Sequence, residues 1–253
     1  MSKPQREPVA GNGVRLEAPL RARTGIEYNN GVDQPNLPDL TARDALRPKL
    51  RGVFHLYAFF VALGACATLL LATSSGTEFL ATLIYSTGLC GVLGISALYH
   101  RIDWAPRKRV WMRRLDHSMI FVLIAGSYTP FPMLVLPGPI GSTTLTWIWL
   151  AALGGLALKL IWIQAPDWLA AAIYVAVGSL IVPSLLPLLE ILGTLPVVLL
   201  GLGGLLYIVG ALIFALQRPD PAPDVFGYHE IFHLCVIAAA VLHFVVIAYW
   251  VVL

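Results

Sequence analysis

Residues 195–216 read LPVVLLGLGGLLYIVGALIFAL, a run with no charged side chain. An α-helix rises 1.5 Å per residue, so about 20 residues cross the roughly 30 Å hydrocarbon layer of a membrane. A helix that is apolar on every face belongs in lipid or deep inside a large protein, because it has no side to present to water. We therefore predict that this segment crosses a membrane as a helix.

The rest of the chain repeats this pattern. Six further apolar runs, separated by polar or Gly- and Pro-containing breaks, lie at about 53–73, 79–100, 117–136, 144–163, 168–189 and 230–252. Only 12% of the residues are charged, against about 25% in soluble domains. Alternation of apolar and polar residues, which is typical of membrane β-strands, is absent. The predicted fold class is an all-α integral membrane protein with a seven-transmembrane helical bundle.

The positive charges predict how this bundle is oriented. Most of the 17 Lys and Arg residues lie in the first fifty-odd residues and between 101 and 114. The loops on the opposite side carry only Glu78 and Glu190. Because Lys and Arg accumulate in cytoplasmic loops, we expect a cytoplasmic N-terminus, an outside C-terminus and a place in the plasma membrane. Residues 1–45 are predicted to be a disordered cytoplasmic tail, and 46–253 the transmembrane domain. Clusters placed between apolar spans favour this topological role over nucleic-acid binding.

Several ionisable residues fall at the ends of predicted spans. His100 ends the second span, Asp116 and His117 open the third, and His229 and His233 open the seventh. Because successive spans run in opposite directions, all five residues are expected at one depth near the cytoplasmic surface. Ionisable groups at membrane depth are costly and usually serve a function.

The spacing of these residues indicates a metal site. His229 and His233 are four residues apart, so their side chains share one face of a helix. Together with His100 they supply three imidazoles, which with one water complete a tetrahedral zinc site. Asp116 is then placed to hold or deprotonate the water. Ser96, one helical turn before His100, is placed to hydrogen-bond the water or a substrate.

The same residues are compatible with different roles. A histidine at a membrane interface often has only a structural role, and Asp116 also has basic neighbours to pair with. His229 to His233 match the HExxH pattern of zinc proteases, in which the Glu is the base. Glu230, however, is about 100° around the helix from His229, so we expect it to face solvent or a basic neighbour. His55 and His117 are expected to support the site without binding the ion.

Three stretches resemble the hemolysin III family, the bacterial branch of the progestin and adipoQ receptor family. They are SALYHR at 96–101, RRLDHSMIFVLIAGSYTPF at 113–131 and GYHEIFH at 227–233. The resemblance spans about residues 47–253. It implies a seven-helix bundle, zinc at the positions of His100, His229 and His233, an Asp116 acting through water, and Ser96 nearby. Family members commonly carry Gln at position 230, which argues against a protease base. The family's first motif is altered here, because the acidic residue and Asn expected before His55 are missing.

The similarity to adiponectin receptors and alkaline ceramidases implies a zinc-dependent hydrolase of a lipid amide or ester. Such an enzyme would act in membrane lipid homeostasis, with membrane lipids as partners and no nucleic acid. Two alternatives are a non-catalytic receptor or fluidity sensor with structural zinc, and a cytolysin as the family name suggests. A shared fold does not fix the substrate.

Overall fold

The structure is a computed structural model and describes residues 48–253; the predicted tail at 1–45 lies outside the described residues. The described part is helical, and its only β-bridge joins Ala222 to Phe226. The elements in chain order are α2 (Val53–Ala72), α3 (Gly76–Arg101), α4 (Pro106–Tyr128), α5 (Pro130–Leu134), α6 (Gly138–Ile161), α7 (Asp167–Gly178), η1 (Ser179–Ser184), α8 (Leu185–Leu192), α9 (Thr194–Leu216), α10 (Tyr228–Val246) and η2 (Ile247–Val252).

These elements form seven spans that are long and apolar enough to cross a membrane. The predicted seven-helix fold class is therefore confirmed. One predicted boundary is wrong, because the third span begins at Pro106 and not at 117. The basic segment 107–114 was expected to be a loop, yet it forms the first turns of α4. Proline suits the first turn of a helix, and the long Lys and Arg side chains form helix readily.

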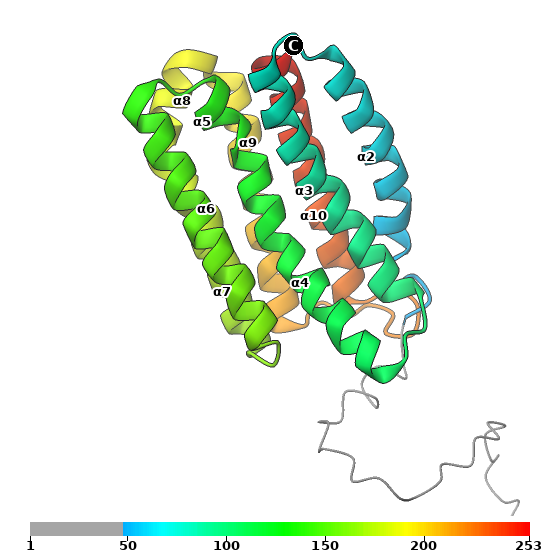
Figure 1. The fold of residues 1–253 in the computed structure, drawn as a ribbon. Helices are drawn as coiled ribbons and strands as arrows, with labels where there is room; N and C mark the ends of the chain where they lie inside the picture. Colours follow the sequence, from blue (N-terminus) through cyan, green and yellow to red (C-terminus); the bar gives the residue numbers. More distant parts are fainter. Residues whose placement is uncertain (1–47) are drawn as a thin grey trace, which may run out of the picture. The chain divides into compact units, whose positions relative to one another are not determined.

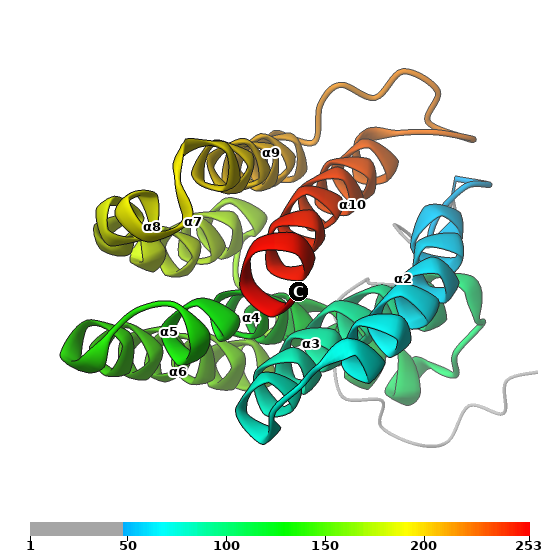
Figure 2. The ribbon, with the colours of Figure 1, turned by 90° about the horizontal axis from the view of Figure 1, so that it is seen from above.

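The seven spans form a ring in chain order (Figures 1 and 2). Each span packs against the next one along the chain, and α10 closes the ring by packing against α2. Viewed from above, α10 lies between α9 and α2 (Figure 2). Spans adjacent in sequence are thus adjacent in space.

Two of the spans are broken by proline. The third changes from α4 to α5 at Thr129–Pro130, and the fifth passes through the 3-10 turn η1, which contains Pro183. Proline has no N–H to donate and interrupts the helical hydrogen bonds. Thr129 remains satisfied, since its hydroxyl donates to the Ala125 carbonyl at 2.7 Å and accepts from the Trp149 indole at 3.1 Å.

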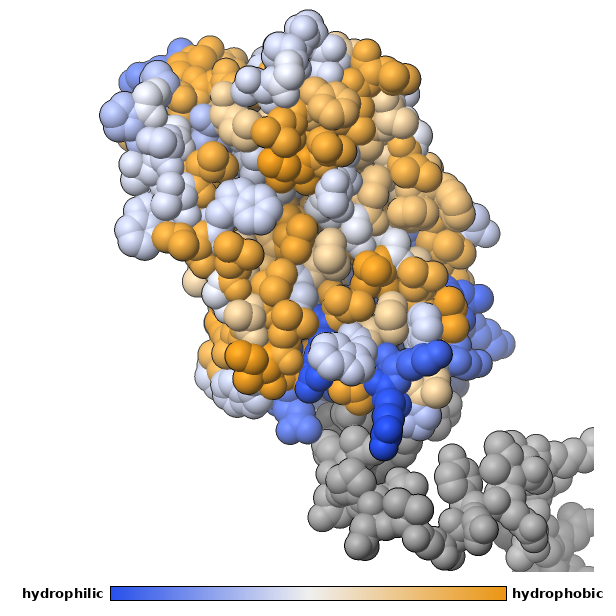
Figure 3. Space-filling model, viewed as in Figure 1, coloured by the Kyte–Doolittle hydropathy of each residue, from blue (hydrophilic) through white to orange (hydrophobic). Residues whose placement is uncertain are grey.

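The outer surface is apolar along the spans and charged at one end. Leu71 and Ile161 are more than four-fifths exposed, as expected for side chains that contact lipid. All described Lys and Arg residues lie where α2, α4, α7 and α10 begin, which we call the basic end. We call the opposite end the distal end. Figure 3 shows strongly hydrophilic residues gathered at the lower, basic end of a largely hydrophobic face.

Candidate metal centre and its cavity

Three histidines from two helices meet at the basic end. His100 lies in the last turn of α3, and His229 and His233 lie in the first turns of α10. One nitrogen of each ring lies within 4.8 Å of the others. The His229 Nε2 is 3.2 Å from the His100 Nε2. His100 and His233 are buried, whereas His229 is partly buried.

This arrangement fits a metal ion. Two nitrogens bound to one tetrahedral zinc at about 2.0–2.1 Å lie about 3.3 Å apart, close to the separation of His100 and His229. The Nδ1 atom of His233 is buried and has no hydrogen-bond partner among the described residues. Buried polar atoms are nearly always paired, so the His233 imidazole has unused capacity to bind an ion. Neutral imidazole is also a ligand type that zinc accepts.

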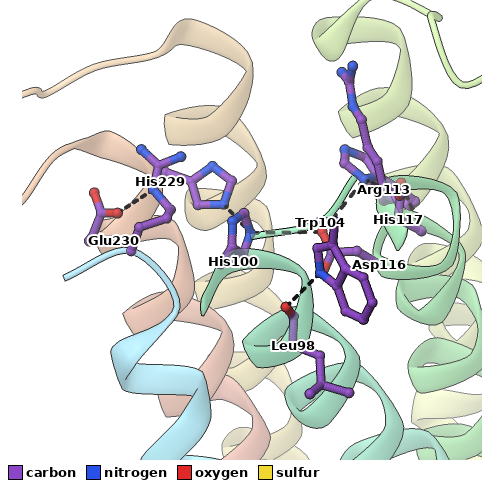
Figure 4. Close-up of polar contacts among 10 residues, drawn as sticks. Leu98, His100, Trp104, Arg113, Asp116, His117, His229 and Glu230 are labelled. Carbon is purple, nitrogen blue, oxygen red and sulfur yellow. Dashed lines mark hydrogen bonds and ion pairs between the residues drawn. The ribbon is translucent and has the colours of Figure 1, made fainter. Parts of the chain in front are cut away.

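Asp116 lies on the other side of His100 from His229 (Figure 4). Its Oδ2 is 4.0 Å from His100 Nε2 and 3.6 Å from His117 Nδ1. Ser96 is within hydrogen-bonding reach of the Asp116 carboxylate. The His117 ring points back along its own helix, where Nδ1 lies 2.9 Å from the Arg113 carbonyl. The carboxylate and the hydroxyl therefore stand beside the imidazole cluster, whereas His117 is engaged with backbone.

His55, near the start of α2, stacks on His233. The ring centroids are 3.8 Å apart and the planes differ by 13°. Neither ring nitrogen of His55 has a hydrogen-bond partner among the described residues. The contact restricts the plane of the His233 ring.

Glu230 is fully buried. The expectation that it faces solvent is wrong, whereas its alternative, a basic neighbour, is confirmed by the ion pair with Arg51. The second carboxylate oxygen accepts from the Gly227 N–H at 2.8 Å. Both carboxylate oxygens therefore have partners. The carboxylate lies on the side of His229 away from His100 (Figure 4). Glu230 is not placed to act as a protease base.

The segment before α2 is tied to the loop before α10. The backbone N–H groups of Lys49 and Leu50 donate to the carbonyls of Asp224 and Val225 at 3.0 and 3.1 Å. This pairing and the ion pair of Arg51 hold the beginning of α2 against the beginning of α10, where two of the three histidines lie.

Gly52 lets this segment approach the metal cluster closely. Its φ of 77° lies in the left-handed region, which glycine adopts without strain. A Cβ added at Gly52 would lie 2.6 Å from the Cβ of His100. Any larger residue would therefore displace the His100 backbone or side chain.

A cavity of about 410 Å³ extends from the histidines into the bundle. Its polar end is lined by His55, Ser96, Asp116, His229 and His233. Its walls are largely apolar and come from α4, α5, α7, η1, α8, α9 and α10. The walls include Ile124, Phe131, Ile181, Leu185, Leu200 and Val236. The volume is in the range of sites for small ligands.

Sequence reasoning missed two features of the site. The sequence marks Arg51 only as a topological charge, although a buried Glu next to the candidate metal ligands needs a cation nearby. Tyr207 lines the cavity from the middle of α9, and nothing in that uniformly apolar run distinguishes it. His243 also lines the cavity, and its Nε2 lies 3.2 Å from the Leu200 carbonyl oxygen.

Comparison with known proteins agrees with this architecture. Residues 44–244 match the model of the family described as haemolysin-III related. The chain belongs to this family. It is 33% identical over 168 residues to Hemolysin-3 of Bacillus cereus, covering 66% of this chain and 74% of that protein. It is 36% identical over 155 residues to the Hemolysin-3 homolog of Bacillus subtilis (strain 168), covering 61% and 70%.

A more distant relative is found in animals. The monocyte to macrophage differentiation factor of Homo sapiens is 27% identical over 200 residues, covering 75% of this chain and 78% of that protein. The resemblance to hemolysin III proteins and to the progestin and adipoQ receptor family is thereby confirmed. The family relationship supports a multi-pass membrane protein, in which lipid surrounds the spans.

Proposed function

We propose that this haemolysin-III-related protein is a zinc-dependent hydrolase that cleaves an ester or amide bond of a membrane lipid, and so acts in lipid homeostasis. The observation that carries the proposal is one cavity that joins two of the candidate ligands, His229 and His233, a carboxylate and a hydroxyl to a long apolar wall. The ligand nitrogen of His100 lies within 4.8 Å of those of both histidines. A lipid has the same division, with a polar linkage at one end and a hydrocarbon chain at the other.

The candidate ligands are His100, His229 and His233. A zinc ion held by three imidazoles supplies a Lewis acid that activates a water and a carbonyl group. His55 keeps the His233 ring in place by stacking on it. The ion pair of Arg51 with Glu230 keeps the first turn of α10 in place, so the two histidines of α10 remain aimed at His100.

Asp116 is the candidate general base. It lines the cavity beside His100, where it would take the proton of the water that attacks the lipid carbonyl. It would then return this proton to the departing alcohol or amine. Ser96, in reach of the carboxylate, would orient it. Water adds to the carbonyl carbon and the bond to oxygen or nitrogen breaks, giving a fatty acid and an alcohol or amine.

We further propose that the basic end faces the cytoplasm of the plasma membrane. The described Lys and Arg residues lie at that end, and the only charged residues described at the distal end are Glu78 and Glu190. This distribution follows the positive-inside rule. The scissile bond would then lie near the headgroups of the inner leaflet.

The proposal is tested with purified protein and two substitutions. We expect wild type to carry one zinc per chain and to release fatty acid from fluorescent ester or ceramide-type lipids. His100→Ala should lose the zinc. Asp116→Asn should keep the zinc and lose about 100-fold or more of the hydrolysis rate.

Asp103→Asn is the matched control. Asp103 is a carboxylate at the same end that does not line the cavity, so this variant should keep both zinc and activity. Wild-type protein without zinc, or full activity in Asp116→Asn, would contradict the proposal. Stoichiometric zinc without turnover of any lipid would instead support a receptor or fluidity sensor with structural zinc.

A further inference from the structure

The cavity has a second polar location, far from the histidine cluster. Tyr207 of α9 and His243 of α10 both line it, and their rings meet edge to face with centroids 5.5 Å apart. His243 follows His233 by ten residues on the same helix, which is about 15 Å along the axis. This second location is therefore near the middle of the hydrocarbon layer, where most of the wall is apolar.

His243 is held in one position. Its Nε2 donates to the Leu200 carbonyl at 3.2 Å. A Cβ added at Gly203 would lie 2.5 Å from the His243 Cδ2, so the histidine packs directly on the α9 backbone. With Nε2 engaged, His243 acts as a fixed wall behind the Tyr207 ring.

The Tyr207 hydroxyl, in contrast, is unused. It is buried, and it has no hydrogen-bond partner among the described residues. Two other tyrosines line the same cavity, and both are satisfied. Tyr128 donates to the Gly178 carbonyl at 2.6 Å, and Tyr174 donates to the His117 carbonyl at 3.1 Å. Since buried hydroxyl groups are nearly always paired, a partner for Tyr207 is to be sought inside the cavity.

We propose that the Tyr207 hydroxyl binds an oxygen carried in the middle of the ligand's hydrocarbon chain. The site would thus prefer a chain with a hydroxyl or keto group over a plain saturated chain. Measured from a carbonyl at the histidine cluster, 15 Å corresponds to roughly a dozen carbons of extended chain. The position of that carbonyl rests on the proposed function; the unpaired hydroxyl does not.

The preference has a simple energetic basis. A plain chain leaves the Tyr207 hydroxyl unpaired in an apolar wall, whereas an oxygenated chain restores the hydrogen bond that the phenol would make in water. A site built to hydrogen-bond a group discriminates against the analogue that lacks it. A hydroxyl on the stretch of chain between the two polar locations would gain nothing, because it would be buried against apolar side chains.

The test is a binding measurement, independent of turnover. Purified protein in lipid nanodiscs would be loaded with a fluorescent fatty acid, and this probe displaced with stearic, 12-hydroxystearic or 7-hydroxystearic acid. We expect 12-hydroxystearic acid to bind about tenfold more tightly than stearic acid. 7-Hydroxystearic acid, whose hydroxyl falls between the two polar locations, should lack this advantage.

Tyr207→Phe removes only the hydroxyl. The ratio of the affinities for 12-hydroxystearic and stearic acid should fall to nearly one, while stearic acid still binds. Retained binding of stearic acid reports that this variant is folded. Tyr128→Phe is the matched control, since its hydroxyl is already bonded to Gly178, and it should keep the preference.

Three results would overturn the inference. They are equal binding of stearic and 12-hydroxystearic acid by wild type, an equal advantage for 7-hydroxystearic acid, and a preference that survives Tyr207→Phe. If none of the acids displaces the probe, the cavity is not a site for acyl chains and the proposed function fails as well. Zinc-dependent hydrolysis without a preference for an oxygenated chain would refute this inference and leave the proposed function standing.

Discussion

The two ends of the bundle are held together by different kinds of contact. At the basic end, polar contacts join segments far apart in the sequence, such as Arg51 with Glu230 and His100 with His229. At the distal end, the polar contacts of Glu78 stay within one turn: its carboxylate accepts from the N–H and the hydroxyl of Ser74, and its N–H donates to the Ser75 hydroxyl. The difference teaches that the charged groups of the site end join distant segments, whereas the charged group of Glu78 at the distal end serves only local capping.

This comparison is tested most strongly by Glu230→Ala. The change leaves the Arg51 guanidinium, which is only 19% exposed, without its partner, and it also removes the acceptor of the Gly227 N–H. Breaking a buried ion pair on one side costs about 3–5 kcal/mol. Thermal unfolding in detergent should show the loss.

The double variant Arg51→Leu/Glu230→Leu provides the control for this prediction. It leaves no unpaired charge, so most of the stability should return. If the single and double variants are equally unstable, the ion pair is not what joins α2 to α10.

An intermediate effect is expected from Gly52→Ala, with Gly193→Ala as its control. Both glycines have positive φ, 77° and 85°, so both changes introduce backbone strain of about 1–3 kcal/mol. Only Gly52 faces a neighbour, the His100 Cβ, whereas a Cβ at Gly193 would meet open space. We therefore expect similar losses in melting temperature but weaker zinc binding, by about tenfold or more, only in Gly52→Ala. Equal zinc affinity in the two variants would show that the close approach does not position His100.

The smallest effect is expected at the distal end from Ser75→Ala. The Ser75 hydroxyl accepts from the Glu78 N–H at 3.2 Å and caps α3. Losing an N-cap costs about 1 kcal/mol, and the cap is a whole helix length from the histidines. Zinc content should be unchanged. A loss of zinc in this variant would mean that the two ends are coupled and the contrast between them is false.

Much of the fold followed from the sequence because the bilayer requires long apolar runs. Each of the seven runs corresponds to a span, including the fifth, where Pro183 breaks the helix without ending the span. The predicted start of the third span was misplaced, because hydropathy marks where a helix enters the lipid and not where the helix itself begins. Arg107 to Arg114 continue α4 beyond that point.

The candidate site was only partly predictable. Alternating directions of the spans were enough to place His100, Asp116 and His229 at one depth, and the structure brings them together. The stacking of His55 on His233 and the ion pair of Arg51 depend on how α2 and α10 pack, which no local pattern encodes. Tyr207 stands out because its buried hydroxyl has no hydrogen-bond partner among the described residues. This property exists only in the folded chain, so no sequence pattern reveals it.

The ring described for the seven spans has a consequence for biosynthesis. Because neighbours in sequence are neighbours in space, the first six spans can assemble as the ribosome delivers them, without waiting for distant segments. His100 is then the one candidate ligand in place, and a single imidazole holds zinc poorly. His229 and His233 arrive together with α10, whose docking against α2 closes the ring. Metal capture is thereby tied to the last joining step of the described spans, so a stalled or truncated intermediate would remain unable to retain the ion.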